Sequence, residues 1–124
     1  GFAVKSHKDL DVWKAAVVLA VDVYTLTKKF PKEEKFGITS QMRRSAYSIA
    51  SNIAEGAARQ TPKEFVQYLY IALGSGDELE TQIEISKRVE LCTEAVANEI
   101  DRGLLRIRQM LRGLIESVRM EKDA

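Results

Sequence analysis

Residues 41–56 read QMRRSAYSIASNIAEG and residues 71–82 read IALGSGDELETQ, and these two stretches decide the fold of this chain. Both place small, polar and charged residues among apolar side chains that recur every three or four positions, which is typical of helices. Helices that pack closely along a specific polar seam need such residues. The two stretches are therefore predicted to be the middle helices of a helical bundle.

Two helices are predicted in the first half of the chain, over about 12–30 and 37–57. Asp9 or Asp11 is the expected cap of the first, since a short acidic side chain accepts backbone N–H groups at a helix start. Pro31 is expected to end this helix because proline pushes the preceding residue out of helical geometry. The whole chain has only two prolines and seven glycines, which favours long helices over many short strands.

The start of a third helix gives the clearest local signal. The tetrapeptide TPKE at 61–64 has threonine as N-cap, proline at the first helical position and glutamate at the third, which is the capping-box pattern. This helix is expected to extend to about residue 89, and Thr93 is expected to cap a fourth. Because short connections make neighbouring helices antiparallel, the predicted fold class is all-α, an antiparallel up-down-up-down four-helix bundle.

Apolar stripes define the expected core. The first and second helices are predicted to bury Trp13, Ala16, Val17, Ala20, Val23, Tyr24, Leu26, Ile38, Met42, Ala46, Ile49 and Ile53. The third and fourth are predicted to bury Phe65, Leu69, Ala72, Gly76, Leu79, Ile83, Ser86, Ile100, Leu104, Ile107, Leu111, Leu114 and Val118. Other large apolar residues fall outside these stripes: Val18, Leu19, Tyr47, Tyr68, Tyr70, Leu73, Leu105, Met110 and Ile115. A second apolar face needs a second surface to bury it, so a homo-oligomer is expected.

The length of 124 residues predicts one domain. Residues 1–10 are predicted to be a flexible N-terminal segment, 11–120 the four-helix bundle and 121–124 a C-terminal tail. No apolar run is long enough to span a membrane and the start has no secretory pattern, so a cytoplasmic location without membrane association is expected. The single cysteine, Cys92, fits a reducing compartment and is expected to behave as a small apolar residue near a helix junction.

No catalytic apparatus is recognisable in the sequence. The only histidine, His7, precedes the first helix, so Cys92 lacks a base that would make it a nucleophile. A di-iron bundle needs Glu-x-x-His pairs, and thiolate zinc sites need more than one cysteine. We therefore expect a protein that is not an enzyme, with no metal, no other cofactor and no small-molecule substrate.

Several segments together resemble a known family. They are Asp11-Val12-Trp13, residues 41–46, residues 48–56, Phe65, Tyr68-Leu69, residues 71–75 and residues 78–82. With these residues the chain resembles the four-helix-bundle proteins encoded within intervening sequences of bacterial 23S ribosomal RNA genes, once labelled S23 ribosomal proteins. The resemblance covers roughly residues 9–115. It implies a bundle that assembles as a ring-like homopentamer, and it supplies no catalytic residues.

The same resemblance extends to a second group of bacterial proteins. The chain is similar in fold to the accessory variability proteins of diversity-generating retroelements, which associate with a reverse transcriptase and nucleic acid. RNA, or a nucleoprotein that contains it, is therefore a partner that the resemblance implies.

Seven arginines are the candidates for nucleic-acid contact: Arg43, Arg44, Arg59, Arg102, Arg106, Arg108 and Arg112. Arg102 with Arg106, and Arg108 with Arg112, are like-charge pairs four residues apart, and each pair costs a few tenths of a kcal/mol in an isolated helix. Phosphates would remove that cost, and arginine is suited to bidentate contact with them.

The acidic third helix offers these arginines an alternative set of partners within the assembly: Asp77, Glu80, Glu84 and Glu90. Three tyrosines pose the same choice, because Tyr47, Tyr68 and Tyr70 could either stack on bases or pack in an interface.

Two further groups of residues are assigned to structure. Asn52, Glu55, Glu78 and Glu80 are predicted to form a polar seam that fixes helix register, since Asn52 and Glu55 share a helix face. Gly74, Ser75 and Gly76 lie inside the third helix, where each glycine costs roughly 1 kcal/mol relative to alanine. Close packing against another helix is the expected reason for them.

Charge is unevenly distributed along a chain whose net charge is only +1. Residues 1–60 contain ten Lys or Arg and six Asp or Glu, residues 61–99 contain three and eight, and residues 100–124 contain six and four. Two hypotheses follow. In the first, basic helices bind structured RNA; in the second, the arginines serve subunit contacts and the protein is an interaction scaffold, which the near-neutral total charge favours.

Overall fold

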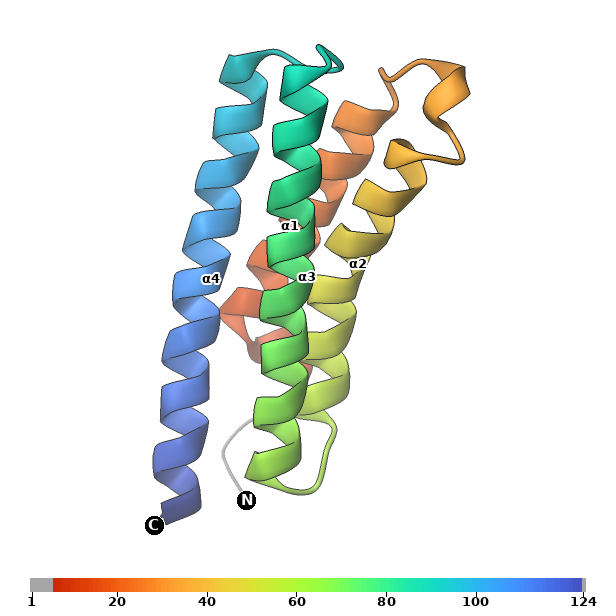
Figure 1. The fold of residues 1–124 in the computed structure, drawn as a ribbon. Coiled ribbons are helices and arrows are strands. Elements are labelled where there is room, and N and C mark those ends of the chain that lie inside the picture. Colours follow the sequence, from red (N-terminus) through yellow and green to blue (C-terminus); the bar gives the residue numbers. More distant parts are fainter. Residues whose placement is uncertain (1–5, 124) are drawn as a thin grey trace.

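Four long helices form the protein in the computed structural model, which describes residues 6–123 (Figure 1). In chain order they are α1 (Asp11–Thr27), α2 (Ile38–Ala57), α3 (Pro62–Arg88) and α4 (Glu94–Asp123). Short 3-10 helices, His7–Asp9 and Lys32–Glu34, precede α1 and α2. No strand occurs between residues 6 and 123. The prediction of an all-α four-helix bundle is confirmed.

Successive helices run in opposite directions. The Ser86 hydroxyl near the end of α3 donates a hydrogen bond of 3.4 Å to the Met42 sulfur near the start of α2. At the other end of the same pair, Gly56 of α2 lies against Phe65 of α3. Figure 1 shows the α1–α2 and α3–α4 connections at one end of the bundle and the α2–α3 connection at the opposite end. The up-down-up-down order follows from these positions.

The four helices contact one another in a ring. The α2–α3 interface is the most extensive and the α1–α4 interface, which closes the ring, is the smallest of the four. The diagonal pairs have no Cα atoms within 8 Å of each other along the part of the chain that the structure describes. Each helix therefore depends on its two neighbours for burial of its apolar stripe.

The two ends of α1 differ from the prediction. Leu10 is the N-cap and makes no side-chain cap hydrogen bond, and Asp11 opens the first turn, where its charge still favours the helix dipole. At the other end α1 stops at Thr27, whose hydroxyl donates to the carbonyl of Val23 at 2.8 Å. Phe30 leaves the helix before Pro31 and is buried in the core.

Both threonine caps are present as predicted. The Thr61 hydroxyl accepts from the Glu64 backbone N–H at 3.2 Å and donates to the Glu64 carboxylate at 2.9 Å. The Thr93 hydroxyl accepts from the backbone N–H of Val96 at 3.2 Å. Between α3 and α4 the backbone of Glu90 has a positive φ of 64°, the left-handed geometry that often ends a helix.

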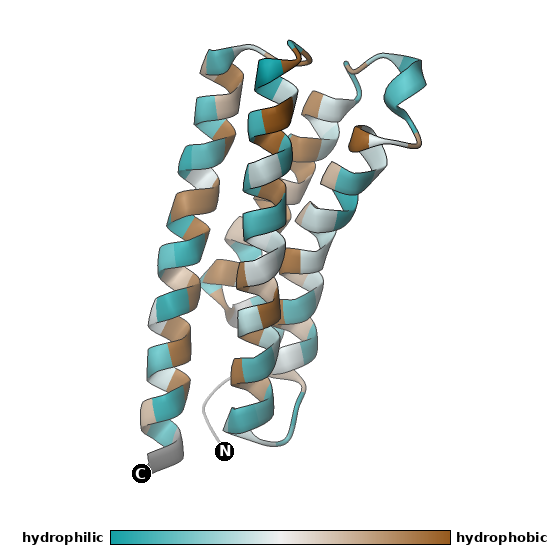
Figure 2. Cartoon of the chain, viewed as in Figure 1, coloured by the Kyte–Doolittle hydropathy of each residue, from teal (hydrophilic) through white to brown (hydrophobic). Residues whose placement is uncertain are grey.

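The core runs the length of the bundle, and Figure 2 shows hydrophobic and hydrophilic residues alternating along every helix. The buried seam of α3 contains every residue predicted for it, from Phe65 to Ser86. On α2, Met42 and the later apolar positions of the stripe are fully buried, whereas Ile38 is only partly buried. Burial of this apolar stripe is the main stabilising term for such helices.

The stripes of α1 and α4 need correction. Leu19, which the sequence placed outside the core, is 3% exposed, and α1 buries Val12, Ala16, Leu19, Val23 and Thr27. On α4, Ile115 is buried and Leu114 only partly so. A straight helix has 3.6 residues per turn, so a strict heptad stripe drifts off the buried face along a helix as long as α4.

The chain ends were expected to lie outside the bundle. Of the predicted N-terminal segment, residues 1–5 lie outside the described part, and His7–Asp9 form a single turn of 3-10 helix. His7 makes an edge contact with Trp13, with ring centroids 5.0 Å apart. At the other end α4 continues to Asp123, so the stretch expected as a tail is mostly helical, and Ala124 lies outside the described residues.

Glycines mark where the helices approach most closely. A Cβ atom on Gly56 would lie 2.8 Å from both Phe65 Cδ1 and Tyr68 Cβ, so α2 and α3 touch there without space for alanine. Gly76 faces Leu104 of α4, and a Cβ atom on Gly76 would lie 3.4 Å from Leu104 Cδ1. Gly74, which was predicted to share this packing role, has no atom within 4 Å of its Cβ position and is exposed.

We expect Gly56→Ala and Gly74→Ala to change stability in opposite directions. The first forces Phe65 and Tyr68 apart and should lower the free energy of unfolding by about 1–3 kcal/mol. The second should raise it by roughly 1 kcal/mol, because alanine is the better helix former and meets open space. Urea denaturation followed by circular dichroism measures both. A destabilised Gly74→Ala protein would contradict the assignment of open space to that position.

Candidate functional site

Arg108 of α4 is bound to the acidic side of α3. Its guanidinium forms an ion pair with Asp77 and donates to Glu80 Oε2 at 2.9 Å. The Arg108 side chain is only 16% exposed because it passes beside Gly76, where no side chain blocks it. Of the two alternatives open from the sequence, the structure places Arg108 in an intramolecular contact.

The other predicted arginines of α4 lie differently. Arg102, Arg106 and Arg112 are exposed and form no ion pair or hydrogen bond within the described residues. Arg102 and Arg106 are one turn apart, and Arg106 borders a groove between α1 and α4 that Asp11, Asp22 and Glu99 also line, whereas Arg112 lies toward the α3 side. Leu105, which lies one turn from Arg102, is 55% exposed. The free positive charge of α4 is therefore concentrated away from the core.

The arginines of α2 and its loop are divided between the interior and the surface. Arg43 is partly buried, and its Nε donates to the Thr27 hydroxyl at 2.8 Å. Its guanidinium carbon lies 3.9 Å from the centroid of the Tyr24 ring, so it fastens α2 to α1. Arg44 is exposed and contacts Gln41 of its own helix, while Arg59 is exposed beside Tyr68.

Contacts between arginine guanidinium groups and tyrosine rings are a feature that sequence reasoning missed. Besides Arg43 on Tyr24, Arg59 lies 4.8 Å from the ring centroid of Tyr68, and Arg119 of α4 lies 5.4 Å from that of Tyr70. In each pair the two residues come from different segments of the chain. Such pairs are worth about 0.5–1 kcal/mol at exposed sites. The sequence contains no signal of spacing that could have matched these partners.

A polar seam joins α2 to α3, but through serines. The hydroxyls of Ser48 and Ser75 are 2.8 Å apart, and the Asn52 amide donates to the Ser48 hydroxyl at 2.9 Å and to its carbonyl at 2.8 Å. Glu55 and Glu78 are exposed and do not join this seam. Ser48 was the missed member, and its position one turn before Asn52 is the signal that could have identified it.

The α3–α4 interface has an acidic character around Asp101. Burial, followed by the nearby charge of Glu80, raises the pKa of Asp101, and its Oδ1 atom is buried without a hydrogen-bond partner. On α3, one turn after Glu80, the Glu84 carboxylate forms ion pairs with Lys87 at 3.0 Å and with Arg88 at 2.8 Å. These contacts lower the pKa of Glu84 and raise that of Lys87.

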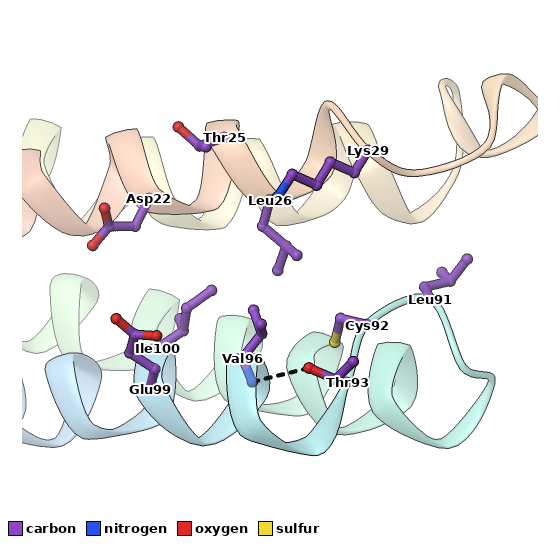
Figure 3. Close-up of a pocket in the computed structure, with 10 residues that line it drawn as sticks. All are labelled: Asp22, Thr25, Leu26, Lys29, Leu91, Cys92, Thr93, Val96, Glu99 and Ile100. Carbon is purple, nitrogen blue, oxygen red and sulfur yellow. Dashed lines mark hydrogen bonds between the residues drawn. The ribbon is translucent and has the colours of Figure 1, made fainter.

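The α1–α4 interface contains a groove with a volume of about 410 Å³. Figure 3 shows Leu26 extending from α1 toward the side formed by Val96 and Ile100, with Asp22 and Glu99 on opposite sides of the opening. Most of the lining is apolar. The groove is therefore suited to an apolar ligand or side chain rather than to a phosphate backbone.

Cys92 lines the same groove in the α3–α4 connection (Figure 3). It is a free, partly buried thiol, and burial raises its pKa. A raised pKa leaves less thiolate at neutral pH, which makes the group a poor nucleophile. Within residues 6–123 no cluster of three or more metal-ligating side chains occurs. None of the helices there is long and apolar enough to cross a membrane.

The fold and its surface define a class of small helical bundles with charged outer faces and a polar seam between the middle helices. The chain belongs to the 23S rRNA-intervening sequence protein family, whose sequence profile matches residues 8–113. The resemblance inferred from the sequence is thus confirmed. The family description names no enzymatic activity.

A solved structure supports the same assignment. The chain is similar to a crystal structure of a protein with unknown function from the S23 ribosomal protein family of Bacteroides thetaiotaomicron VPI-5482. The two are 30% identical in sequence with a TM-score of 0.78, and the match covers 84% of this chain and 97% of that one. A comparison with curated proteins finds no match.

Replacement of Arg108 should destabilise the protein more than replacement of its neighbour Arg106. Arg108→Gln removes both contacts to α3 and leaves two carboxylates near each other, so we expect a loss of about 1 kcal/mol in unfolding free energy, limited by the exposure of the carboxylates. Arg106→Gln should change it by less than about 0.5 kcal/mol. Equal effects in chemical denaturation would show that Arg108 contributes nothing through α3.

Asp101→Asn should stabilise the protein at neutral pH. Because the folded-state pKa of Asp101 is raised, its ionised form destabilises the fold as pH rises through the ordinary and then the raised pKa. The amide removes this effect. We therefore expect a higher Tm than wild type at pH 7 and a smaller difference at pH 4. Glu116→Gln, an exposed change on the same helix, is the control, and a pH-independent difference would contradict the prediction.

Proposed function

We propose that this protein is a non-enzymatic helical bundle that binds structured RNA, or a nucleoprotein containing it, through the outward arginines of α4. The observation that carries the proposal is that Arg102, Arg106 and Arg112 are exposed and have no anionic partner in the described chain, whereas Arg108 has two. The family description, which refers to a 23S rRNA-intervening sequence, gives additional support.

The physical argument concerns like charges on one helix. Arg102 and Arg106 repel each other across one turn, at a cost of a few tenths of a kcal/mol. A phosphate backbone that lies along α4 would reverse this repulsion into attraction and release its bound counterions. Such binding depends strongly on salt and weakly on sequence. A bacterial cytoplasmic location is part of the proposal, because that compartment holds RNA and keeps the single thiol reduced.

Self-assembly is the second part of the proposal. Several large apolar side chains remain on the outside of the single chain, among them Val18, Val21, Ile71, Leu105 and Met120. Contact between copies would remove these side chains from water. A homopentamer is the assembly that the family resemblance implies. A ring would also repeat the α4 arginines around its circumference, so several weak phosphate contacts would act together.

A second candidate function is a protein-interaction scaffold without nucleic-acid activity. The groove between α1 and α4 favours it, because the lining around Leu26 and Val96 is mostly apolar and its opening is flanked by Asp22 and Glu99. A net charge of +1 favours it too, since dedicated nucleic-acid binders are usually more basic. In this case the α4 arginines serve contacts between subunits.

Fluorescence anisotropy with a structured ribosomal-RNA hairpin, titrated at low and at physiological salt, tests the proposal. The wild type should bind at low salt and weaken steeply as salt rises. The variant Arg102→Gln/Arg106→Gln/Arg112→Gln should bind roughly tenfold more weakly or worse, and its salt slope should fall by roughly 0.7–0.9 for each lost phosphate contact.

A variant with the same loss of charge elsewhere is the matched control. Lys14→Gln/Lys32→Gln/Lys35→Gln removes three exposed cations from α1 and the α1–α2 connection, and it should retain most of the affinity. Equal loss in both variants would mean that net charge, not the α4 face, determines binding. Absence of binding at either salt favours the scaffold. Sedimentation velocity on wild type and both variants reports whether the arginine changes disrupt assembly instead.

A further inference from the structure

A small pocket with basic and aromatic side chains lies where the start of α3 meets the end of α4. Its volume is about 290 Å³, and it is lined by Pro62, Lys63, Val66, Gln67, Tyr70 and Arg119. None of these residues belongs to the proposed phosphate-binding arginines of α4. Arg119 is more than three helical turns along α4 from Arg106 and further still from Arg102. It is therefore a feature separate from the proposed phosphate-binding face.

Tyr70 and Arg119 lie next to each other in this pocket, and the pair is called the platform below. The Tyr70 side chain is 48% exposed, and the guanidinium of Arg119 lies 5.4 Å from the ring centroid. Aromatic rings and guanidinium planes are the two surfaces on which unstacked bases most often lie in RNA complexes. A platform that already exists needs little ordering when a base binds, so less entropy is lost.

Two positive charges surround the platform without an opposing acid. Lys63 and Arg119 both line the pocket, and neither forms an ion pair within residues 6–123. The exposed amide of Gln67 lies one turn from both Lys63 and Tyr70 on α3 and offers a donor and an acceptor. Val66 supplies a buried apolar wall. The pocket therefore contains groups suited to each part of a nucleotide: a surface for the base, hydrogen-bonding groups and positive charge for the phosphate.

The other tyrosines have different surroundings. Tyr24 has two cations beside its ring, Arg43 at 3.9 Å and Lys28 at 5.7 Å, but that arginine is already held by the Thr27 hydroxyl. Tyr68 faces the α2–α3 interface, where it lies against Gly56. Tyr47 is as exposed as Tyr70, at 46%, but its groove between α1 and α2 contains one cation, Lys28. Tyr70 combines a guanidinium beside its ring with a second cation, Lys63, among the residues that line its pocket.

We propose that this pocket binds one unpaired nucleotide, with the base stacked on the Tyr70–Arg119 platform and the phosphate between Lys63 and Arg119. The inference rests on the proposed function in that the nucleotide belongs to the RNA held by α4. It adds a specific preference for RNA with an unpaired or looped base, which backbone contacts alone do not give.

Adenosine 5′-monophosphate is the probe, and inorganic phosphate and adenosine are the comparison ligands. In heteronuclear NMR titrations of the whole protein, the nucleotide should shift the backbone signals of Gln67, Tyr70 and Arg119. Phosphate alone should shift them much less. Shifts of equal size with phosphate would mean an anion site only and would overturn the proposal, as would no shifts at these residues with the nucleotide.

Variants separate stacking from other effects. Tyr70→Ala should weaken nucleotide binding about fivefold or more, the range expected for loss of one stacked base, whereas Tyr70→Phe should retain it. Lys63→Gln should weaken the nucleotide but leave adenosine unchanged. Tyr47→Ala, a change at an equally exposed tyrosine, is the matched control and should have no effect. Loss of binding in Tyr47→Ala, or none in Tyr70→Ala, overturns the site.

The hairpin titration tells this inference apart from the proposed function. If RNA binding falls with the α4 triple variant and Tyr70→Ala changes neither hairpin nor nucleotide affinity, the proposed function stands and the nucleotide site is wrong. If the nucleotide binds in a Tyr70-dependent way but no hairpin binds, the pocket stands as a nucleotide site and the RNA function is wrong.

Discussion

The close approach of α2 to α3 is the contact on which the rest of the bundle depends. At one end Gly56 allows Phe65 and Tyr68 to touch the α2 backbone, and at the other Ser86 donates to Met42. Between them the Ser48–Ser75 hydroxyl pair fixes the register. A shift of one residue would separate these partners and push side chains against the glycine, so the two helices have one favourable alignment.

That fixed alignment determines which charges remain available. With α3 held against α2, its acidic residues Asp77 and Glu80 lie beside α4 and bind Arg108, while Arg102 and Arg106 stay on the outside. The same packing directs Arg43 onto Tyr24. The arginines therefore serve two different purposes. Some connect neighbouring helices, and others give the surface a positive face without a partner in the chain.

Features that depend on residues adjacent in sequence were predicted correctly, whereas features that depend on how the helices pack were not. The Thr61 cap depends on residues adjacent in sequence, so it could be predicted without the fold. Leu19 lies in a run that is apolar on every side, and only the position of α2 and α4 decides which residues are buried. Gly74 and Gly76 present the same problem, since two similar residues point to opposite sides of α3. Arg108 and Arg106 likewise point to different sides of α4, so only Arg108 of the two reaches the carboxylates of α3.

One of the four helix–helix interfaces is weaker than the others. The α1–α4 interface is the smallest and contains the groove beside Cys92, so the bundle should open there first during native-state fluctuations. Amide hydrogens of α1 would then exchange with solvent sooner than those of α2 and α3, and the thiol would become transiently accessible. A ligand that fills this groove would hold α1 against α4 and so slow the opening of the bundle, without blocking any reaction.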